Sequence, residues 1–438
     1  MPTHDLIIIG AGPGGYDTAA LAASGGQSVL LIEKSHLGGT CLNCGCIPTK
    51  ALRHTAMVLE ECRSAIEAGV ECGAPTLHFA KAMARKDAVV EQLREGIATL
   101  LAKVEVVKGE AVFVGPHEVE FDARRFSAPK IIIATGSRPA VPPIEGAGLA
   151  MTSTDLLSID HLPQSLAIIG GGVIGMEFAS IFNSFGVAVT VIEMASEILP
   201  GMDADVAKRL RMLLKRRGVS FAVGACVERI VPGFTVSYTA KGKPAAVEAD
   251  CVLMAVGRRP VVPAGIEEIG VELERGFIKV DPDTMATSAD GVYAVGDVNG
   301  LCLLAHAAAA QGRRALGIDQ SLDIIPAVAF TIPECAMVGL TADAARANGI
   351  NVLTGTAFYR ANGKSVADGA TEGMLRITVD ADTRRIIGCH GFGADVSMLV
   401  QEVATAMSLG ADAVQMVGAV RSHPTVSEII TDALANLR

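Results

Sequence analysis

Asp5-Leu-Ile-Ile-Ile-Gly-Ala-Gly-Pro-Gly-Gly15 is a short apolar run that enters a glycine loop of the form G-x-G-x-x-G. In such a loop Gly10 makes a tight turn, Gly12 lets the backbone approach a pyrophosphate, and Gly15 lets a helix pack closely on the strand. An alanine-rich segment follows at 16–23. The stretch therefore predicts a strand, a phosphate-binding turn and a helix.

The same arrangement occurs a second time in the chain. The apolar run 166–169 enters another loop of this form, whose glycines are Gly170, Gly172 and Gly175. In each copy a second apolar run ends in a glutamate, Glu33 or Glu193, 21 residues after the middle glycine. A carboxylate at that distance accepts hydrogen bonds from ribose hydroxyls. Two copies in this context predict two dinucleotide-binding units.

Three cysteines follow the first loop, in Gly38-Gly-Thr-Cys-Leu-Asn-Cys-Gly-Cys-Ile-Pro-Thr-Lys50, and two of them, Cys41 and Cys46, form the pair of interest. Cys41 and Cys46 can exchange two electrons reversibly through a disulfide. A dinucleotide beside them must accept electrons from a thiolate, which a flavin does and a nicotinamide does not readily do. We therefore assign FAD to the first loop and NAD to the second. No arginine behind Glu193 is placed to bind a 2′-phosphate, which favours NAD over NADP.

The spacing of the two thiols predicts a reducible bridge. Residues five apart on one helical path do not share a face, so a Cys41–Cys46 disulfide would distort the turn. A position near a helix start also lowers the pKa of a thiol, which favours a Cys46 thiolate beside the flavin.

Composition argues against several other classes of protein. The 438 residues carry a net charge of −10 without a large basic cluster, so nucleic acid is not an expected partner. Charged residues interrupt the longest apolar stretches, and no export signal precedes the first strand, so neither a membrane span nor secretion is expected. Ten scattered cysteines fit a reducing cytoplasm.

Seven of these cysteines lack the spacing of metal ligands, so no metal site is expected. We expect them to be buried as small apolar residues: Cys62, Cys72, Cys226, Cys251, Cys302, Cys335 and Cys389.

The chain resembles the pyridine nucleotide–disulfide oxidoreductase family, most closely its dihydrolipoamide dehydrogenase branch. The resemblance covers nearly the whole chain and is carried by residues 38–50, 170–178, Ala-Val-Gly-Asp at 294–297, Leu-Leu-Ala-His at 303–306 and His-Pro-Thr-Val-Ser-Glu at 423–428. It implies a homodimer that binds FAD and NAD. It also implies oxidation of dihydrolipoamide, free or on a lipoylated carrier protein, through a redox-active Cys41–Cys46 disulfide.

The resemblance also implies an α/β fold with two Rossmann-like domains and a C-terminal α+β dimerisation domain. Strand-like runs and later helical periodicity after residue 325 agree with the last of these. The expected regions are an FAD-binding domain at 1–140, an NAD-binding domain at 141–261, a central domain at 262–324 and an interface domain at 325–438.

Individual roles follow from the resemblance. Cys46 is the thiol nearest the flavin and Cys41 exchanges with substrate. Lys50 and Glu177 form an ion pair beside the reactive edge of the flavin. Further FAD contacts are implied at Ala111, Gly136, Asp297 and the helix that opens near Ala305, and NAD contacts at Val227 and Gly257.

His423 and Glu428 are assigned the acid–base role. Exchange needs a thiolate, and an ordinary dithiol is mostly protonated at neutral pH. Imidazole titrates in the useful range, and a carboxylate partner fixes its tautomer. Pro424 sets a turn before the next helix, so Glu428 can fold back onto His423. In the family this base serves the other subunit, which would make the dimer obligatory.

Some positions depart from the family pattern. Cys44 stands where relatives commonly have valine or arginine, and we interpret it as a spectator thiol. An alternative Cys41–Cys44 disulfide, or an oxidation-sensitive switch, stays open. Arg421, Ser397 and Gln311 also replace residues that are usual in relatives. These changes leave the substrate less determined than the mechanism.

Two alternative functions therefore remain. One is a mercuric reductase or another NAD(P)H-dependent reductase of low-molecular-weight disulfides, although the chain has no vicinal cysteine pair near residue 438. The other belongs to a different class and is a redox-silent flavoprotein that serves as a core subunit or thiol sensor.

Overall fold

The first glycine loop joins strand β1 (Leu6–Ile9) to helix α1 (Pro13–Ser24) in the computed structural model, which describes residues 3–438. Strand β1 is fully buried and pairs in parallel with β2 (Val29–Glu33) and β7 (Lys130–Ile133). With β3 (Glu105–Lys108) and β19 (Val292–Ala294) they form one parallel sheet in the order β19-β7-β1-β2-β3. The strand sequence is apolar throughout because both faces of the sheet are covered.

The second glycine loop joins β9 (Ser165–Ile169) to α6 (Val173–Ser184) in the same way. Its parallel sheet has the order β11-β10-β9-β15, from β10 (Ala188–Glu193), β11 (Ser220–Val223) and β15 (Cys251–Met254). An antiparallel sheet of β12 (Ala225–Val231), β13 (Thr235–Ala240) and β14 (Lys243–Glu248) lies beside it. The two predicted Rossmann-like sheets are confirmed.

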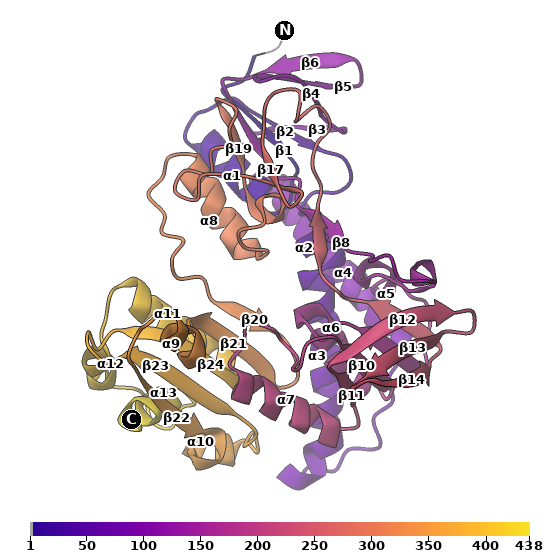
Figure 1. The fold of residues 1–438 in the computed structure, drawn as a ribbon, viewed down its shortest axis with the longest axis vertical. Helices are drawn as coiled ribbons and strands as arrows, with labels where there is room; N and C mark the ends of the chain where they lie inside the picture. The colour runs from indigo at the N-terminus through magenta and orange to yellow at the C-terminus, as the bar shows by residue number, and fades with distance from the viewer. Residues whose placement is uncertain (1–2) are drawn as a thin grey trace.

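The C-terminal part is an antiparallel sheet with helices against it (Figure 1). Its order is β20-β21-β24-β23-β22, and α11 (Val396–Ser408) and α13 (Glu428–Ala435) pack on it. The strands are β20 (Ala327–Ala329), β21 (Glu334–Gly339), β22 (Val352–Phe358), β23 (Met374–Asp380) and β24 (Ile386–Gly393). This confirms the predicted α+β unit.

Two long helices connect these parts. Helix α3 (Cys46–Ser64) packs against α4 (Phe79–Leu100) and α6. Because α6 packs on the second sheet, α3 connects the redox segment at its start to that sheet. Figure 1 shows this pair running from the first sheet at the top down past the second. The other helices are α2 (Gly39–Cys44), α5 (Ser153–Leu156), α7 (Ala204–Arg216), α8 (Ala305–Ala315), α9 (Ala342–Ala347), α10 (Gly363–Ala367) and α12 (Ala413–Gly418).

Short strands complete the structure. A three-stranded antiparallel sheet contains β4 (Val112–Gly115), β5 (Glu118–Phe121) and β6 (Arg124–Ser127). Two-stranded pairs are formed by β8 (Ser137–Pro139) with β16 (Arg258–Pro260), and by β17 (Leu273–Glu274) with β18 (Phe277–Ile278). Strand β8 follows β7 of the first parallel sheet in the chain and β16 follows β15 of the second, so their pairing connects the two sheets.

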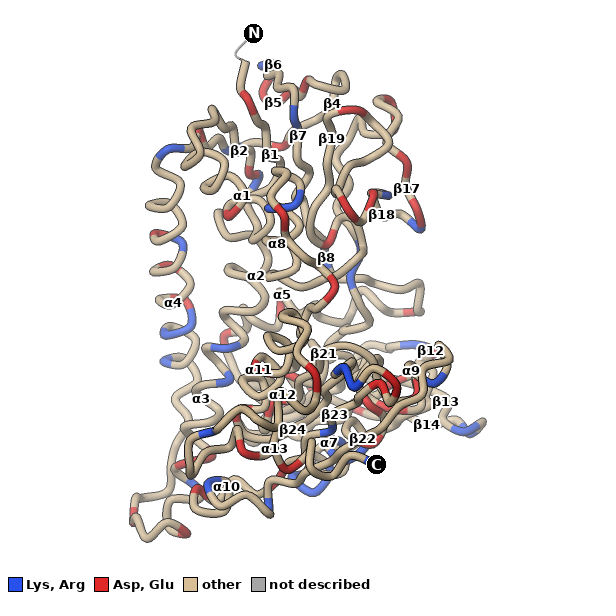
Figure 2. The backbone as a smooth tube through the Cα atoms, turned by 90° about the vertical axis from the view of Figure 1, so that its left-hand side faces the viewer, with Lys and Arg blue, Asp and Glu red and all other residues tan. Residues whose placement is uncertain are grey.

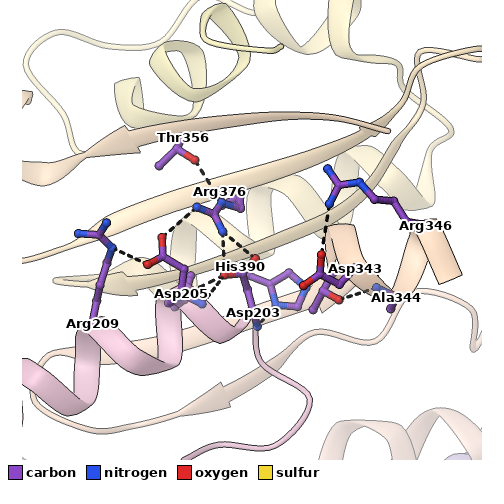
Figure 3. Close-up of polar contacts among 11 residues, drawn as sticks. Asp203, Asp205, Arg209, Asp343, Ala344, Arg346, Thr356, Arg376 and His390 are labelled. Atoms are coloured by element: carbon purple, nitrogen blue, oxygen red, sulfur yellow. Dashed lines mark hydrogen bonds and ion pairs between the residues drawn. The ribbon is translucent and has the colours of Figure 1, made fainter. Parts of the chain in front are cut away.

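A half-buried ion network joins helix α7 to the C-terminal sheet (Figure 3). The Arg376 guanidinium on β23 contacts both oxygens of Asp203 at 2.9 and 3.0 Å and one oxygen of Asp205 at 3.0 Å. Asp203 also caps α7 by accepting from the backbone N–H groups of Asp205 and Val206. His390 on β24 lies beside it and accepts from the Asp203 N–H.

Charge is dispersed along the chain. Figure 2 shows basic and acidic residues intermingled on α4 and over the C-terminal part. Within residues 3–438, no helix combines the length and hydropathy that crossing a bilayer requires.

The prediction that seven cysteines are buried is wrong for four of them. Cys251, Cys335 and Cys389 are buried, whereas Cys62 and Cys302 are half-buried and Cys72 and Cys226 are exposed. Cys72 lies in a loop and Cys226 lies on the edge strand β12, and at both positions no other element covers the side chain.

Candidate functional site

The first glycine loop has room for a pyrophosphate. A Cβ on Gly10 would lie 2.4 Å from the Ala134 carbonyl oxygen, and one on Gly15 would lie 1.8 Å from the Gly10 oxygen. A Cβ on Gly12 would meet nothing closer than Gly39 at 4.0 Å. No side chain caps the start of α1, so its N-terminal N–H groups remain available to an anion. The outer glycines are needed for packing, and the middle one leaves space for a ligand.

The second loop repeats this geometry. A Cβ on Gly170 would lie 2.4 Å from the Ala255 oxygen, and one on Gly175 would lie 2.0 Å from the Gly170 oxygen. Nothing lies within 4 Å of a Cβ on Gly172, and no side chain caps α6. Both loops therefore fit a dinucleotide phosphate.

The two glutamates stand at matching places beside these loops. Glu33 accepts from the N–H of Ala11 at 2.7 Å, and Glu193 accepts from the N–H of Gly171 at 2.5 Å. The second oxygen of Glu193 accepts from the N–H of Ala195 at 2.6 Å. Each carboxylate is thus held against the glycine loop at the end of its strand, where a ribose would lie.

Asp297 lies just after β19, at the edge of the first sheet. It accepts from the Ser137 hydroxyl, and the Arg258 guanidinium lies 3.6 Å away. The Arg258 Nε also donates to the Ser137 hydroxyl at 2.6 Å. Sequence reasoning did not single out Ser137 or Arg258, although they lie in two similar runs, Ala-Thr-Gly-Ser-Arg-Pro at 134–139 and Ala-Val-Gly-Arg-Arg-Pro at 255–260.

The remaining predicted cofactor positions lie around the two loops. Ala305 begins α8, and no side chain caps that helix start. Ala111 is buried, and Val227 is half-buried on β12. Gly136 and Gly257 precede β8 and β16 with φ of 69° and 115°, and a Cβ on either would meet nothing within 4 Å. Open space at both glycines is compatible with ligand contact.

The dithiol segment is not one helical path, contrary to the prediction. Helix α2 ends at Cys44, Gly45 adopts φ −146° and ψ −111°, and α3 begins at Cys46. This break brings Cys46 close enough to Cys41 for the two thiols, which are free in the structure, to shift each other's pKa. The bridge is therefore favoured by the break rather than by a distorted helix.

The two thiols differ in acidity. The hydrogen bond from Cys41 and the positive charge of Lys50 lower the pKa of Cys46 to about 7, against the opposing effect of burial. The hydrogen bond to Cys46 and burial raise the pKa of Cys41 well above its ordinary value. Cys46 thus carries the thiolate and Cys41 the proton.

Lys50 lies one turn further along α3 and pairs with Glu177 of α6. The Lys50 ammonium contacts the two carboxylate oxygens at 2.9 and 3.0 Å, and Glu177 is buried. The backbone N–H of Phe330 donates to the same carboxylate at 2.8 Å, and the Lys50 ammonium lies 4.5 Å from the centre of the Phe330 ring. Phe330, which the sequence reasoning missed, therefore holds the ion pair from a third part of the chain.

His423 and Glu428 form the expected pair. The His423 Nδ1 lies 2.9 Å from a Glu428 oxygen, and the N–H of Thr425 donates to the other oxygen at 3.0 Å. The hydrogen bond from the Thr425 N–H lowers the pKa of Glu428 most, and the hydrogen bond with His423 lowers it further. The His423 side chain is 80% exposed. Its Nε2 is therefore free to meet a molecule from outside this chain.

Within one chain the histidine does not reach the thiols. Figure 1 shows α13, which begins at Glu428, in the lower part of the molecule and α2, which carries Cys41, far above it. The structure thus brings Cys41, Cys46, Lys50 and Glu177 together and leaves the His423–Glu428 pair on a separate surface.

Comparison with protein families assigns both halves of the chain. Residues 4–312 match the pyridine nucleotide-disulphide oxidoreductase family, and residues 325–434 match the dimerisation domain of the same family.

Known proteins match over the full length. A dihydrolipoyl dehydrogenase of Geobacillus stearothermophilus is 38% identical, with 98% of this chain and 95% of the relative covered. One of Thermus scotoductus is 39% identical, with 99% and 97% covered. Among solved structures, the Cu(II) complex of the HOCl-induced flavoprotein disulfide reductase RclA of Escherichia coli superposes with a TM-score of 0.88 at 31% identity, covering 99% of both chains.

Proposed function

Since the chain belongs to the pyridine nucleotide-disulphide oxidoreductase family and is a flavoprotein disulfide oxidoreductase, we propose that it oxidises dihydrolipoamide with NAD. The observation that carries the proposal is the unequal thiol pair, with an acidic Cys46 beside Lys50 and a protonated Cys41. A thiol pair of this kind suits a dithiol substrate, which must attack one sulfur and release the other.

The chain supplies the exchange chemistry itself. A substrate thiolate attacks the Sγ of Cys41 in the oxidised pair, the Cys41–Cys46 bond breaks, and Cys46 leaves as a thiolate beside Lys50. The second substrate thiolate then attacks the substrate sulfur of the mixed disulfide, which forms lipoamide and releases Cys41. Two substrate protons are removed in these steps, one of them through His423.

Glu428 orients this base. Its charge and its hydrogen bond to Nδ1 hold the imidazole so that Nε2 faces the substrate. The low pKa of Glu428 keeps its carboxylate charged at neutral pH. In this proposal His423 acts in the partner subunit of a homodimer, because the histidine and the thiols of one chain lie apart.

The C-terminal part offers a surface for such a dimer. Large apolar side chains are exposed there, with Val420 at 100%, Leu409 at 81% and Val414 at 64%. Exposed apolar residues grouped on one domain are typical of a surface that a second subunit covers. This part also matches the family's dimerisation domain.

The residues around each glycine loop are compatible with a bound dinucleotide. FAD would be held by the loop at Gly10–Gly15, Glu33 and Asp297, and NAD by the loop at Gly170–Gly175 and Glu193. When bound, FAD supplies an electron-pair carrier between a reduced thiol pair and NAD. The Glu193 carboxylate, held by two backbone N–H groups, would repel the 2′-phosphate of NADP.

Steady-state kinetics with purified holoenzyme test the proposal. Dihydrolipoamide with NAD should be oxidised rapidly, and glutathione disulfide with NADPH should react at least about 100-fold more slowly in kcat/KM, the usual scale for a missing specific contact. A Cys41→Ser variant controls for contaminating activity. Undetectable oxidation of dihydrolipoamide, together with fast reduction of another disulfide or of mercuric ion, would replace the substrate assignment. Inactivity with every acceptor would favour a redox-silent flavoprotein.

A further inference from the structure

Cys44 is a third thiol in the redox segment, and the exchange chemistry above leaves it unused. It is the last residue of α2 and lies three positions after Cys41. Residues at this spacing lie on one helix face with Cβ atoms about 5–6 Å apart. A disulfide needs about 3.5–4.5 Å between Cβ atoms, so the Cβ atoms of Cys41 and Cys44 would have to approach each other only slightly for a bond to form.

The local backbone permits this tightening. The helix ends at Cys44, and Gly45 behind it already leaves the helical conformation at φ −146° and ψ −111°. Only the end of α2 has to move. The residue before Cys44 is held, because the Asn43 side chain donates to the Leu37 and Gly39 carbonyls at 2.9 and 2.8 Å and accepts from Arg94. Movement confined to Cys44 and Gly45 therefore need not displace Cys41.

Cys44 is also accessible, unlike the structural cysteines of the chain. It is half-buried, whereas Cys335 and Cys389 are fully buried and burial raises the pKa of each. Solvent access allows a thiol to lose its proton and to act as a nucleophile.

We propose that Cys44 is a second exchange partner of Cys41 and that the enzyme holds two isomeric active-site disulfides. The Cys44 thiolate attacks the Sγ of Cys41 in the Cys41–Cys46 disulfide, a Cys41–Cys44 bond forms, and Cys46 leaves as a thiolate. The proton of the Cys44 thiol passes to solvent. The oxidation state of the three sulfurs together is unchanged, so no external oxidant is required. The proposal rests on the proposed function, which supplies the oxidised Cys41–Cys46 bond.

The structure favours attack at Cys41 over attack at Cys46. Disulfide exchange is faster when the departing sulfur has the lower pKa. Departure of Cys46 is assisted by the positive charge of Lys50, which favours the Cys46 thiolate. Cys44 also shares α2 with Cys41, whereas the break at Gly45 separates it from Cys46.

The exchanged form is an inactive isomer of the oxidised enzyme, and it can return to the active form. Its disulfide lies within α2, and Cys46 is left as a free thiolate without an oxidised partner. Because exchange releases one proton when Cys44 starts as a thiol and Cys46 ends as a thiolate, the ratio of the exchanged to the ordinary form should rise with pH, by at most about tenfold per unit, and stay constant at low pH, where Cys46 also is protonated. The reverse attack of Cys46 on Cys41 restores the active form.

Differential thiol labelling of oxidised holoenzyme tests the proposal. The enzyme is equilibrated without reductant between pH 6 and pH 9 and its free thiols are trapped with a fast maleimide. The disulfide is then reduced and its thiols receive a second label. All three cysteines fall in one tryptic peptide, 35–50, whose fragment masses place each label. Trapped Cys46 should increase with pH at the expense of trapped Cys44, and a long-wavelength thiolate–flavin absorbance should increase in parallel.

Two variants make the outcome decisive. Cys44→Ser should abolish trapping of Cys46 and the absorbance of the oxidised enzyme, whereas Cys72→Ser, an exposed cysteine on a distant loop, should leave both unchanged. Trapping of Cys44 alone at every pH overturns the proposal and leaves the proposed function standing. If Cys41 and Cys46 are both trapped in oxidised Cys44→Ser, they form no disulfide, and the proposed function itself fails.

Discussion

Arg376→Leu should destabilise the protein because it leaves a buried carboxylate without its cation. The Asp203 side chain is 9% exposed and contacts the Arg376 guanidinium through both oxygens. Removing one partner of a buried ion pair costs about 3–5 kcal/mol. Asp203 keeps two backbone N–H donors, at 3.0 and 3.2 Å, and Arg376 is 23% exposed, so we expect a loss below that range, about 2–3 kcal/mol.

Urea unfolding of the holoenzyme, followed by circular dichroism at fixed protein concentration, measures the loss. Arg209→Leu is the matched control, since Arg209 contacts the same Asp205 from an exposed position on α7. Its loss should stay below about 1 kcal/mol.

A double-mutant cycle separates the charge from the packing of the side chain. In an Asp203→Asn background, Arg376→Leu should lose less than about 1 kcal/mol, because no buried charge is left unpaired. Equal losses in the two backgrounds would refute the reasoning and assign the effect of Arg376 to packing.

Three further predictions concern titrating groups. His423→Gln should lower kcat for dithiol oxidation about 100-fold or more, while His306→Gln, whose imidazole binds a backbone carbonyl on the same chain, should change it less than about threefold; equal losses would remove the base role. Alkylation of Cys46 in the reduced enzyme should slow about tenfold per pH unit below pH 7, because its lowered pKa keeps it a thiolate above that pH, and a midpoint near 9 would contradict the assigned acidity. Burial lowers the pKa of His390, whose Nε2 has no partner among residues 3–438, so the folded state keeps this imidazole neutral. Below pH 6.5 the unfolded state binds a proton that the folded state does not, so the free energy of unfolding should fall as the pH drops. In urea titrations, His390→Asn should make this dependence on pH weaker.

Local chemistry explains why much of the fold could be predicted. A strand that is apolar throughout, followed by glycines at fixed spacing, has few ways to fold other than the turn seen at Gly10 and Gly170. The change from these units to an antiparallel C-terminal sheet was also visible as a change in the pattern of residues.

Contacts between distant segments were not readable in the same way. Phe330 donates its backbone N–H to Glu177, and any residue except proline presents that group, so no side-chain signal marks it. The break at Gly45 was missed because residues 39–64 have one helical character, and only the folded chain shows φ −146° at that position.

The amino-acid sequence by itself determined the two glycine loops, the dithiol segment and the His423–Glu428 contact, because each depends on residues close together in the chain. The sequence already favoured Cys46 as the thiolate, but only the tertiary structure decided how acidic that thiol is, since its pKa depends on Cys41, Lys50 and Glu177 meeting around it. It also decided that His423 lies apart from its own chain's thiols, because the packing of whole domains sets that separation.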